Sequence, residues 1–139
     1  MSINRSLFSS KKMDWETPQA FFDELNLEFS FTLDACATPE NAKCKSFFTI
    51  YDDALKQDWF GNVWMNPPYG RSIGKWIRKA YLEVQVGNAD LVVCLIPART
   101  DTAYWHDYCM KGEIRFIRGR LCFSNAGRAP FPSAIVIFR

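Results

Sequence analysis

Apolar positions along the chain form two kinds of run, which predict alternating strands and helices. Over residues 73–84, apolar side chains recur every three to four positions, which is the pattern of an amphipathic helix. Continuous apolar stretches at 62–65 and 91–96 predict buried strands, the second covered on both faces of a mainly parallel sheet. Weaker patterns predict further helices over 18–26 and 102–110, and strands over 29–33 and 46–51.

The C-terminal third predicts a different arrangement. Strand-like runs at 113–117, 120–123 and 133–138 leave no room for helices between them, so we expect them to pair antiparallel. The chain therefore predicts a single α/β domain over residues 14–139, with a mostly parallel sheet closed by C-terminal antiparallel strands. The polar residues 1–13 predict a flexible N-terminal tail.

The sequence Asn66-Pro67-Pro68-Tyr69 directly follows the apolar run at 62–65. Two consecutive prolines cannot continue a central strand, and a residue before proline is driven toward extended geometry. The result is a stiff corner at the carboxyl end of a strand, where open α/β sheets bind ligands. An amide, two carbonyls and an aromatic ring in fixed directions suit a flat ring with an exocyclic amino group. The alternative is a proline-rich turn with a surface tyrosine.

Charged residues add a second candidate and a hint about partners. Asp34, at the end of the first predicted strand, is placed either to meet amino or hydroxyl groups of a ligand or to cap the next turn. Residues 1–58 hold 6 Lys/Arg against 10 Asp/Glu, and residues 59–139 hold 11 against 5. The basic second half fits a polyanion such as nucleic acid, or an ordinary solvated surface.

Several function classes lack support. There is no Gly-rich dinucleotide or phosphate-binding loop. The only histidine is His106, and the five cysteines have no close-pair spacing, so we expect no metal site. No signal peptide and no membrane-length apolar run occur, which predicts a reduced cytosolic compartment without membrane attachment.

A set of short motifs, taken in order, resembles phage-type Dam-like DNA N6-adenine methyltransferases from about residue 14 to the end. Asn-Pro-Pro-Tyr alone also marks methyltransferases that act on cytosine N4 or on protein glutamine, whereas the ordered set is more specific. The motifs are Trp15-x-Thr17-Pro18, Leu33-Asp34, Asn41-Ala42-Lys43-Cys44, Asp58-Trp59, Asn66-Pro67-Pro68-Tyr69, Leu95-Ile96-Pro97-Ala98-Arg99 and Gly119-Arg120-Leu121-x-Phe123.

The resemblance implies a Rossmann-like methyltransferase fold, S-adenosylmethionine as methyl donor and double-stranded DNA as substrate. In the family pattern, the Asn66 side-chain oxygen and the Pro67 carbonyl accept the two N6 hydrogens of adenine. Pro68 completes the rigid corner, and Tyr69 stacks on the base. An adenine inside a duplex must first be flipped out of the stack.

For the donor, the resemblance implies that Thr17, Pro18 and Asp34 lie near the methionine part. It matches Asp58 to the cofactor adenine and, more weakly, Asp53 to the ribose. Where a glycine-rich turn is usual in methyltransferases, this chain has Asp34-Ala35-Cys36-Ala37. How closely the backbone approaches the donor there is therefore open.

DNA contacts are expected from short loops, because the chain has no room for a separate recognition domain. Lys75, Arg78 and Lys79 are expected to form a solvated helix face. The resemblance suggests a GATC-like target, a phage or prophage gene acting in the bacterial cytoplasm, and a role connected with restriction-modification. Alternatives are methylation of RNA or protein glutamine, or a catalytically idle DNA-binding module. The arginines proposed to contact DNA are Arg71, Arg99, Arg118, Arg120 and Arg128.

Overall fold

The computed structural model describes residues 14–139, so the predicted tail over 1–13 lies outside the described residues. A six-stranded sheet has the order β2-β1-β3-β4-β8-β5. Its members are β1 (Leu33–Asp34), β2 (Ser46–Phe47), β3 (Gly61–Met65), β4 (Ala89–Pro97), β5 (Glu113–Phe116) and β8 (Ser133–Phe138).

The sheet is mostly parallel. The four strands β2, β1, β3 and β4 run parallel to one another. Strand β8 runs antiparallel both to β4 and to the edge strand β5. A mostly parallel sheet with an α/β element order is therefore confirmed. The antiparallel pairing comes from β8, which lies between β4 and β5 and runs opposite to both.

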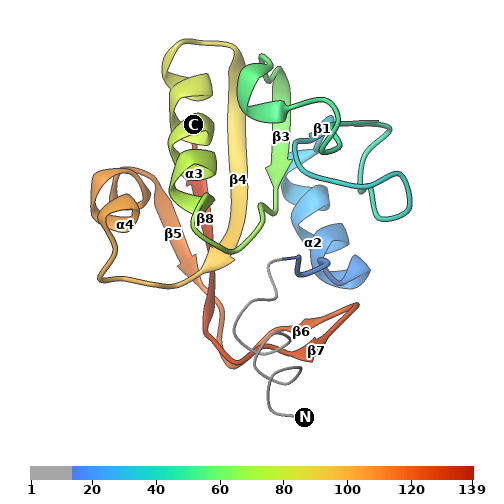
Figure 1. Ribbon diagram of the computed structural model, residues 1–139, viewed down its shortest axis with the longest axis vertical. Helices are drawn as coiled ribbons and strands as arrows, with labels where there is room; N and C mark the ends of the chain where they lie inside the picture. Colours follow the sequence, from blue (N-terminus) through green and yellow to red (C-terminus); the bar gives the residue numbers. More distant parts are fainter. Residues whose placement is uncertain (1–13) are drawn as a thin grey trace.

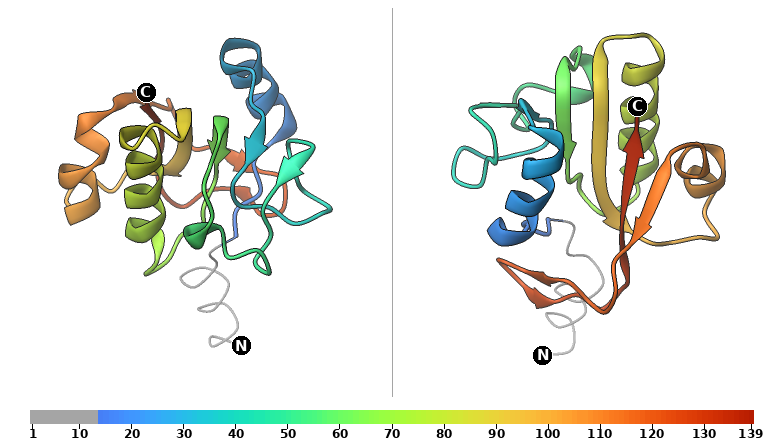
Figure 2. Two further views of the ribbon diagram at one scale, coloured as in Figure 1. Left: turned by 90° about the horizontal axis from the view of Figure 1, so that it is seen from above. Right: turned by 180° about the vertical axis from the view of Figure 1, so that it is seen from behind.

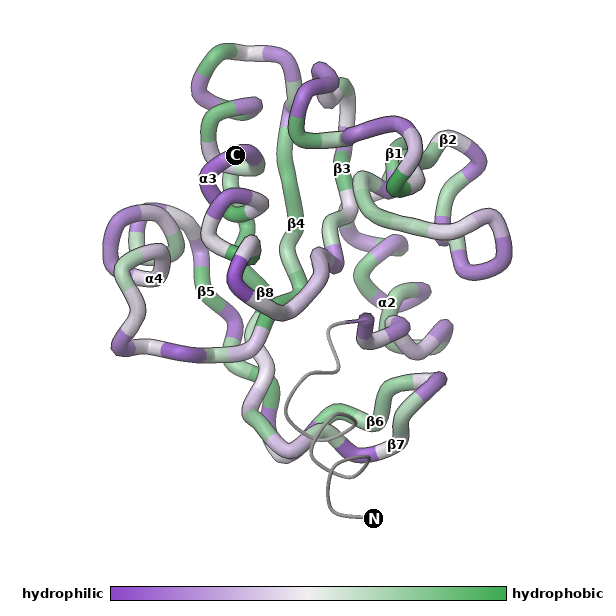
Figure 3. The backbone as a smooth tube through the Cα atoms, viewed as in Figure 1, coloured by the Kyte–Doolittle hydropathy of each residue, from purple (hydrophilic) through white to green (hydrophobic). Residues whose placement is uncertain are grey.

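Helices cover both faces of this sheet, as Figure 2 shows. Helix α3 (Ile73–Gln85) packs on β4 and β8, while α2 (Gln19–Phe29) lies on the opposite face. A short helix α4 (Ala103–Asp107) continues into the 3-10 turn η2 (Cys109–Lys111), and a second 3-10 turn, η1 (Ala54–Lys56), precedes β3. The most apolar segments are β4 and β8 (Figure 3), and all six residues of β8 are buried because both of its faces are covered.

Four of the predicted elements differ from the structure. Helix α2 runs on to Phe29, whose side chain is buried, and ends at Ser30 in the left-handed region, so β1 keeps only Leu33 of the strand predicted over 29–33. The predicted strand over 46–51 stops at Phe47, because Asp52 accepts hydrogen bonds from the backbone and hydroxyl of Thr49 and closes a turn. The predicted 120–123 strand is β6 (Cys122–Phe123), which leaves the main sheet and pairs with β7 (Gly127–Arg128).

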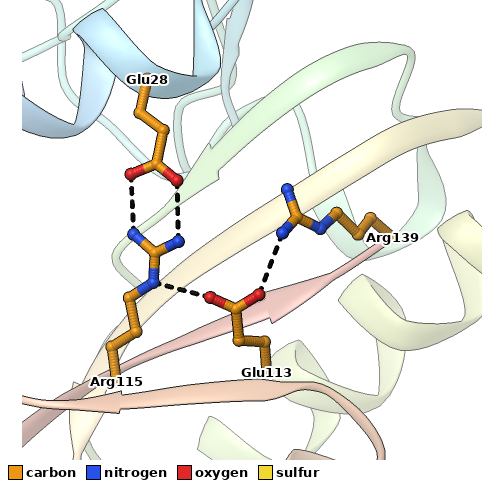
Figure 4. Close-up of polar contacts among 4 residues, drawn as sticks. All are labelled: Glu28, Glu113, Arg115 and Arg139. Carbon is orange, nitrogen blue, oxygen red and sulfur yellow. Dashed lines mark hydrogen bonds and ion pairs between the residues drawn. The ribbon is translucent and has the colours of Figure 1, made fainter.

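An ion-pair network ties α2 to the far edge of the sheet (Figure 4). Arg115 of β5 binds both carboxylate oxygens of Glu28 at 2.7 Å and also binds Glu113 at 2.7 Å. Arg139 binds the other oxygen of Glu113 at 2.9 Å. Both guanidinium groups lie over the ring of Phe29, at 5.4 and 5.9 Å.

Replacing Arg115 with alanine is expected to lower the free energy of unfolding by about 1 kcal/mol, because the network is well formed but more than a third exposed. The loss should shrink in high salt, since exposed charges are screened. Urea denaturation at low and high salt measures both effects. Lys75→Ala, an exposed lysine on α3, is the control. Equal unfolding curves for the two variants would contradict the network's contribution.

Within residues 14–139, no helix is both long and apolar enough to cross a bilayer.

The strands β1, β3 and β4 end together at one end of the sheet. Because these strands are parallel, their carboxyl ends bring Asp34, Asn66 and Ala98 to the same side of the sheet.

Candidate active site

A cavity of about 300 Å³, called the corner cavity here, opens at the carboxyl ends of β1 and β3. Its walls come from the segment before α2, the loop after β1, and the first residues of the Asn-Pro-Pro-Tyr corner. A volume of this size is at the lower end of those that hold small organic ligands. The lining residues are Asp14, Trp15, Glu16, Thr17, Asp34, Cys36, Ala37, Thr38, Asn41, Lys43, Ile50, Trp64, Asn66, Pro67 and Pro68.

The amide of Asn66 has a fixed orientation. Its Nδ2 donates to the backbone carbonyl of Trp15 and, at 3.0 Å, to Oγ1 of Thr17. Because a backbone carbonyl only accepts, the nitrogen of the amide must face Trp15. The Oδ1 atom is then turned the other way, and it is buried without a hydrogen-bond partner among residues 14–139. Such an acceptor is rare in folded proteins, and an N–H donor of a bound ligand would satisfy it.

Thr17 does not cap the helix that follows, although a threonine before a proline is typical of a helix start. The residue before α2 is Pro18 in extended conformation, and no side chain caps the helix. Thr17 is instead buried and accepts the hydrogen bond from Asn66. Its place in the cavity wall keeps it as a candidate ligand contact, whereas Pro18 sets the start of α2 and is not in the cavity wall.

Asp34 organises the loop that replaces a glycine-rich turn. One carboxylate oxygen accepts the backbone N–H of Cys36 at 3.2 Å, and the other accepts that of Lys43 at 3.0 Å. The loop is also held by its backbone, since Ala35 donates to the carbonyl of Trp64 and Ala37 to that of Phe48. One buried carboxylate therefore fixes both ends of the 36–43 segment in the cavity wall.

Burial raises the pKa of Asp34 to about 6, although the two backbone hydrogen bonds oppose this shift. The raised pKa means that the folded protein holds this proton more tightly than the unfolded chain does. The contribution of Asp34 to stability is therefore full below about pH 4 and is lost as the pH rises through about 6. The shift corresponds to about 3 kcal/mol.

Asp34→Asn is therefore expected to remove a decline in unfolding free energy that the wild type shows between about pH 4 and 7. Urea denaturation of both proteins across this range tests the slope, which is the informative quantity because the amide also alters the loop's hydrogen bonds. An NMR titration of the Asp34 carboxyl carbon provides a direct check. Parallel stability curves, or a midpoint below pH 4, would overturn this assignment.

Tyr69 is buried behind the corner, outside the lining of the corner cavity. Its hydroxyl donates to the carbonyl of Leu95 at 3.0 Å, and its ring packs edge-on against Phe123 and Phe131. Burial raises its pKa well above the usual range. In this conformation the ring fixes the corner to β4, and stacking on a base stays a prediction.

The two remaining carboxylates are not brought to the corner cavity. Asp58 is exposed and lies before β3, so it borders a hollow at the opposite, amino-terminal edge of the sheet. Asp53 is exposed and pairs with Lys56 at 3.6 Å. Neither residue lines the corner cavity, so contacts of Asp53 and Asp58 with the cofactor stay predictions.

The five candidate arginines fall into two groups, and all are exposed. Arg71 and Arg99 line a groove of about 450 Å³ between the start of α3 and α4, on the far side of Gly70 from the corner cavity. Arg118, Arg120 and Arg128 lie on or beside the β6–β7 hairpin. Lys79, in contrast, has only 16% of its side chain exposed and pairs with Glu83, so for Lys79 the expected solvated face is wrong.

Sequence reasoning missed part of the cavity wall. Asn41 and Lys43 were noted only as part of a motif, without a role. Within the described residues 14–139, Asp14, Glu16 and Asp34 give the cavity wall three carboxylates against the ammonium of Lys43, which suits a ligand carrying positive charge. Among residues 14–139, no group of three His, Cys, Asp or Glu side chains is placed to hold a metal ion.

Comparison with known proteins identifies the family of this chain. A family model described as DNA N-6-adenine-methyltransferase (Dam) matches residues 5–134. A DNA N-6-adenine-methyltransferase of Haemophilus phage HP1 (strain HP1c1) is 34% identical over 126 residues, covering 84% of this chain and 71% of the relative. One of Escherichia phage T1 is 33% identical over 94 residues, covering 66% of this chain and 38% of the relative. The chain thus spans well under half the length of the second relative. The family model covers nearly the whole sequence, and the chain belongs to the DNA N-6-adenine-methyltransferase (Dam) family.

Proposed function

We propose that this protein transfers a methyl group from S-adenosylmethionine to N6 of adenine in double-stranded DNA. The observation that carries the proposal is the buried, unpartnered Oδ1 of Asn66 at the carboxyl edge of the sheet. Membership of the Dam family supports adenine in DNA over RNA or protein glutamine as the substrate. The sheet order and its single antiparallel strand are compatible with a Rossmann-like methyltransferase fold.

Asn66 Oδ1 and the Pro67 carbonyl would accept the two N6 hydrogens of a flipped adenine. With both hydrogens held, the nitrogen lone pair is directed out of the base plane, toward the corner cavity. As the nitrogen gains positive charge, these acceptor contacts strengthen, so they stabilise the transition state more than the ground state. The rigid Pro67-Pro68 backbone keeps the acceptors in place before the base arrives.

The corner cavity is the proposed donor site. S-adenosylmethionine would supply an electrophilic methyl carbon on a positively charged sulfur. The bond from that carbon to sulfur would break as the bond to N6 forms, which leaves neutral S-adenosylhomocysteine, and one N6 proton would be released. The carboxylates of Asp14, Glu16 and Asp34 give the wall a negative charge that favours this cation. Lys43, whose Nζ donates to Oε1 of Gln19 at 2.9 Å, would also meet the donor's carboxylate. Thr17 stays in the proposed site, whereas Asp53 and Asp58 are not in the wall of the corner cavity.

DNA is proposed to lie across the carboxyl edge, held by both groups of arginines. The groove arginines Arg71 and Arg99 flank the corner, and Arg118, Arg120 and Arg128 extend the positive surface along the hairpin. Contacts to phosphates would supply affinity, and contacts to base edges would supply sequence choice. A GATC-like sequence is the first target to test. Phage or host DNA in the bacterial cytoplasm is the proposed substrate in the cell.

Incubation of purified protein with isotopically labelled S-adenosylmethionine and unmethylated duplex DNA tests this function. We expect label in DNA that is released by DNase, and recovery of the label as N6-methyladenine after digestion. A protein that binds the donor but labels no duplex DNA would instead be an idle binding module. Label that survives DNase and resides in RNA or glutamine would identify a different substrate.

A further inference from the structure

The β6–β7 hairpin lies against the segment that forms one wall of the corner cavity (Figure 1). At its turn, Asn125 Oδ1 accepts the backbone N–H of Glu16 at 2.9 Å, and Asn125 Nδ2 donates to the carbonyl of Asp14 at 3.1 Å. Next to it, the Ser124 N–H donates to the Glu16 carbonyl at 3.0 Å. The exposed side chain of Asn125 thus forms hydrogen bonds with both a donor and an acceptor of the 14–16 backbone, as the backbone of a neighbouring strand would.

Aromatic packing reinforces this attachment. The ring of Trp15 meets Phe123 of β6 edge-on at 5.3 Å and Phe131 at 5.1 Å. The same two phenylalanines pack against Tyr69 at 6.3 and 5.7 Å. The hairpin therefore touches the Asn66 corner from two sides, through Trp15 and through Tyr69.

The segment 14–17 in turn sets the orientation of Asn66. Its Trp15 carbonyl and Thr17 hydroxyl take both hydrogens of the Asn66 amide, which leaves Oδ1 turned away from this segment. Movement of the segment would release the amide to rotate. A continuous set of hydrogen bonds thus runs from Asn125, through residues 14–17, to the proposed acceptor of the adenine N6 hydrogens.

The outer face of the hairpin carries charge instead. Side chains alternate along paired strands, so Phe123 of β6 points inward and is buried, whereas Arg128 of β7, which pairs with Cys122, is exposed. Arg120 lies two residues before β6 and is also exposed. The exposed side of this short hairpin is therefore distinct from the side that packs on the Asn66 corner.

We propose that Asn125 is a positioning residue for the reaction, and that the β6–β7 hairpin links DNA contact on its outer face to the orientation of Asn66 on its inner face. This inference rests on the proposed function. It separates two roles within one element. Arg128 acts on DNA affinity, and Asn125 acts on the rate once DNA is bound.

Steady-state kinetics on duplex DNA at saturating donor test this separation. For Asn125→Ala, we expect kcat to fall about tenfold with KM for DNA within about twofold of the wild type, because the hydrogen bonds that hold the segment are lost. For Arg128→Ala, we expect KM to rise several-fold and kcat to stay within about twofold. Asn125→Asp keeps the acceptor for Glu16 but not the donor to Asp14, and should lie between wild type and alanine. Lys75→Ala is the control with unchanged kinetics.

Thermal unfolding of each variant guards against a general loss of structure, and Asn125→Asp replaces the alanine variant in the comparison if the latter unfolds early. Unchanged kcat in both Asn125 variants, or a change confined to KM for DNA, would overturn the inference while leaving the proposed function intact. A wild type that transfers no methyl group to duplex DNA would instead refute the proposed function itself.

Discussion

Asn66→Ala is expected to lower the rate of methyl transfer to DNA by about a hundredfold or more, with the protein still folded. Among residues 14–139, Asn66 Oδ1 is the one buried side-chain acceptor at the corner without a hydrogen-bond partner. Alanine removes the contact that holds one N6 hydrogen and that strengthens as N6 becomes positive. Because the loss concerns the transition state, kcat should fall much more than the affinity for donor.

The rate is measured with labelled donor under single-turnover conditions, so that product release does not mask the chemical step. Circular dichroism and thermal unfolding establish that the variant is folded, and donor binding is measured separately by calorimetry. Thr17→Ala provides an intermediate case, since it removes one of the two acceptors that orient the amide. A near-normal rate of methyl transfer by Asn66→Ala would contradict the proposed mechanism.

Glu83→Ala is expected to lower the free energy of unfolding by about 3–5 kcal/mol, the largest stability effect that we foresee. Glu83 lies on α3 and is only 5% exposed. Its Oε1 accepts the backbone N–H of Trp59 at 2.6 Å, and its Oε2 lies 3.3 Å from Nζ of Lys79. Truncation leaves a buried N–H unpaired and a largely buried ammonium without its counter-charge.

Urea denaturation measures the change, with a fall in melting temperature of about 10 °C or more as a second readout. Arg78→Ala, an exposed residue on the same helix, should alter stability by less than about 0.5 kcal/mol. Glu83→Gln keeps an acceptor for Trp59 but not the charge, so it should fall between the two. A loss below about 1 kcal/mol for Glu83→Ala would show that the cluster contributes little.

Local sequence patterns predicted the elements whose stability depends mainly on their own burial. The apolar runs of β3 and β4 and the apolar face of α3 are visible in the sequence, because a strand or helix that is covered by neighbours must be apolar at fixed spacing. The Asn-Pro-Pro-Tyr corner was equally predictable, because proline restricts the backbone whatever surrounds it.

Features that depend on distant partners were not predictable in this way. Thr17 has the chemistry of a helix cap, and only the tertiary fold gives its hydroxyl to Asn66, 49 positions away in the sequence. Lys79 has the spacing of a surface residue, yet Glu83 and the Trp59 ring enclose it. Asn125 contacts a segment 109 residues earlier, and no local pattern signals such a contact.

The position of Asp58 could have been corrected from sequence order alone. It precedes β3, whereas Asn66 follows β3, so a parallel strand must place the two residues at opposite edges of the sheet. The family resemblance suggested a cofactor contact at Asp58, and the direction of the strand argues against it. The loop after Asp34 was harder to predict from the sequence. Hydrogen bonds from the backbone N–H groups of Cys36 and Lys43 to the Asp34 carboxylate fix this loop, where other methyltransferases have a glycine-rich turn.

The central claim is that the Asn66 corner directs methyl transfer to N6 of adenine in DNA. Expression of wild type and Asn66→Ala in a bacterial host that lacks adenine methylation, followed by mapping of N6-methyladenine across its DNA, tests this claim most directly. We predict N6-methyladenine at one recurring short sequence with the wild type and none above background with the variant. Absence of the modified base with the wild type, or equal modification by the two proteins, would contradict the claim.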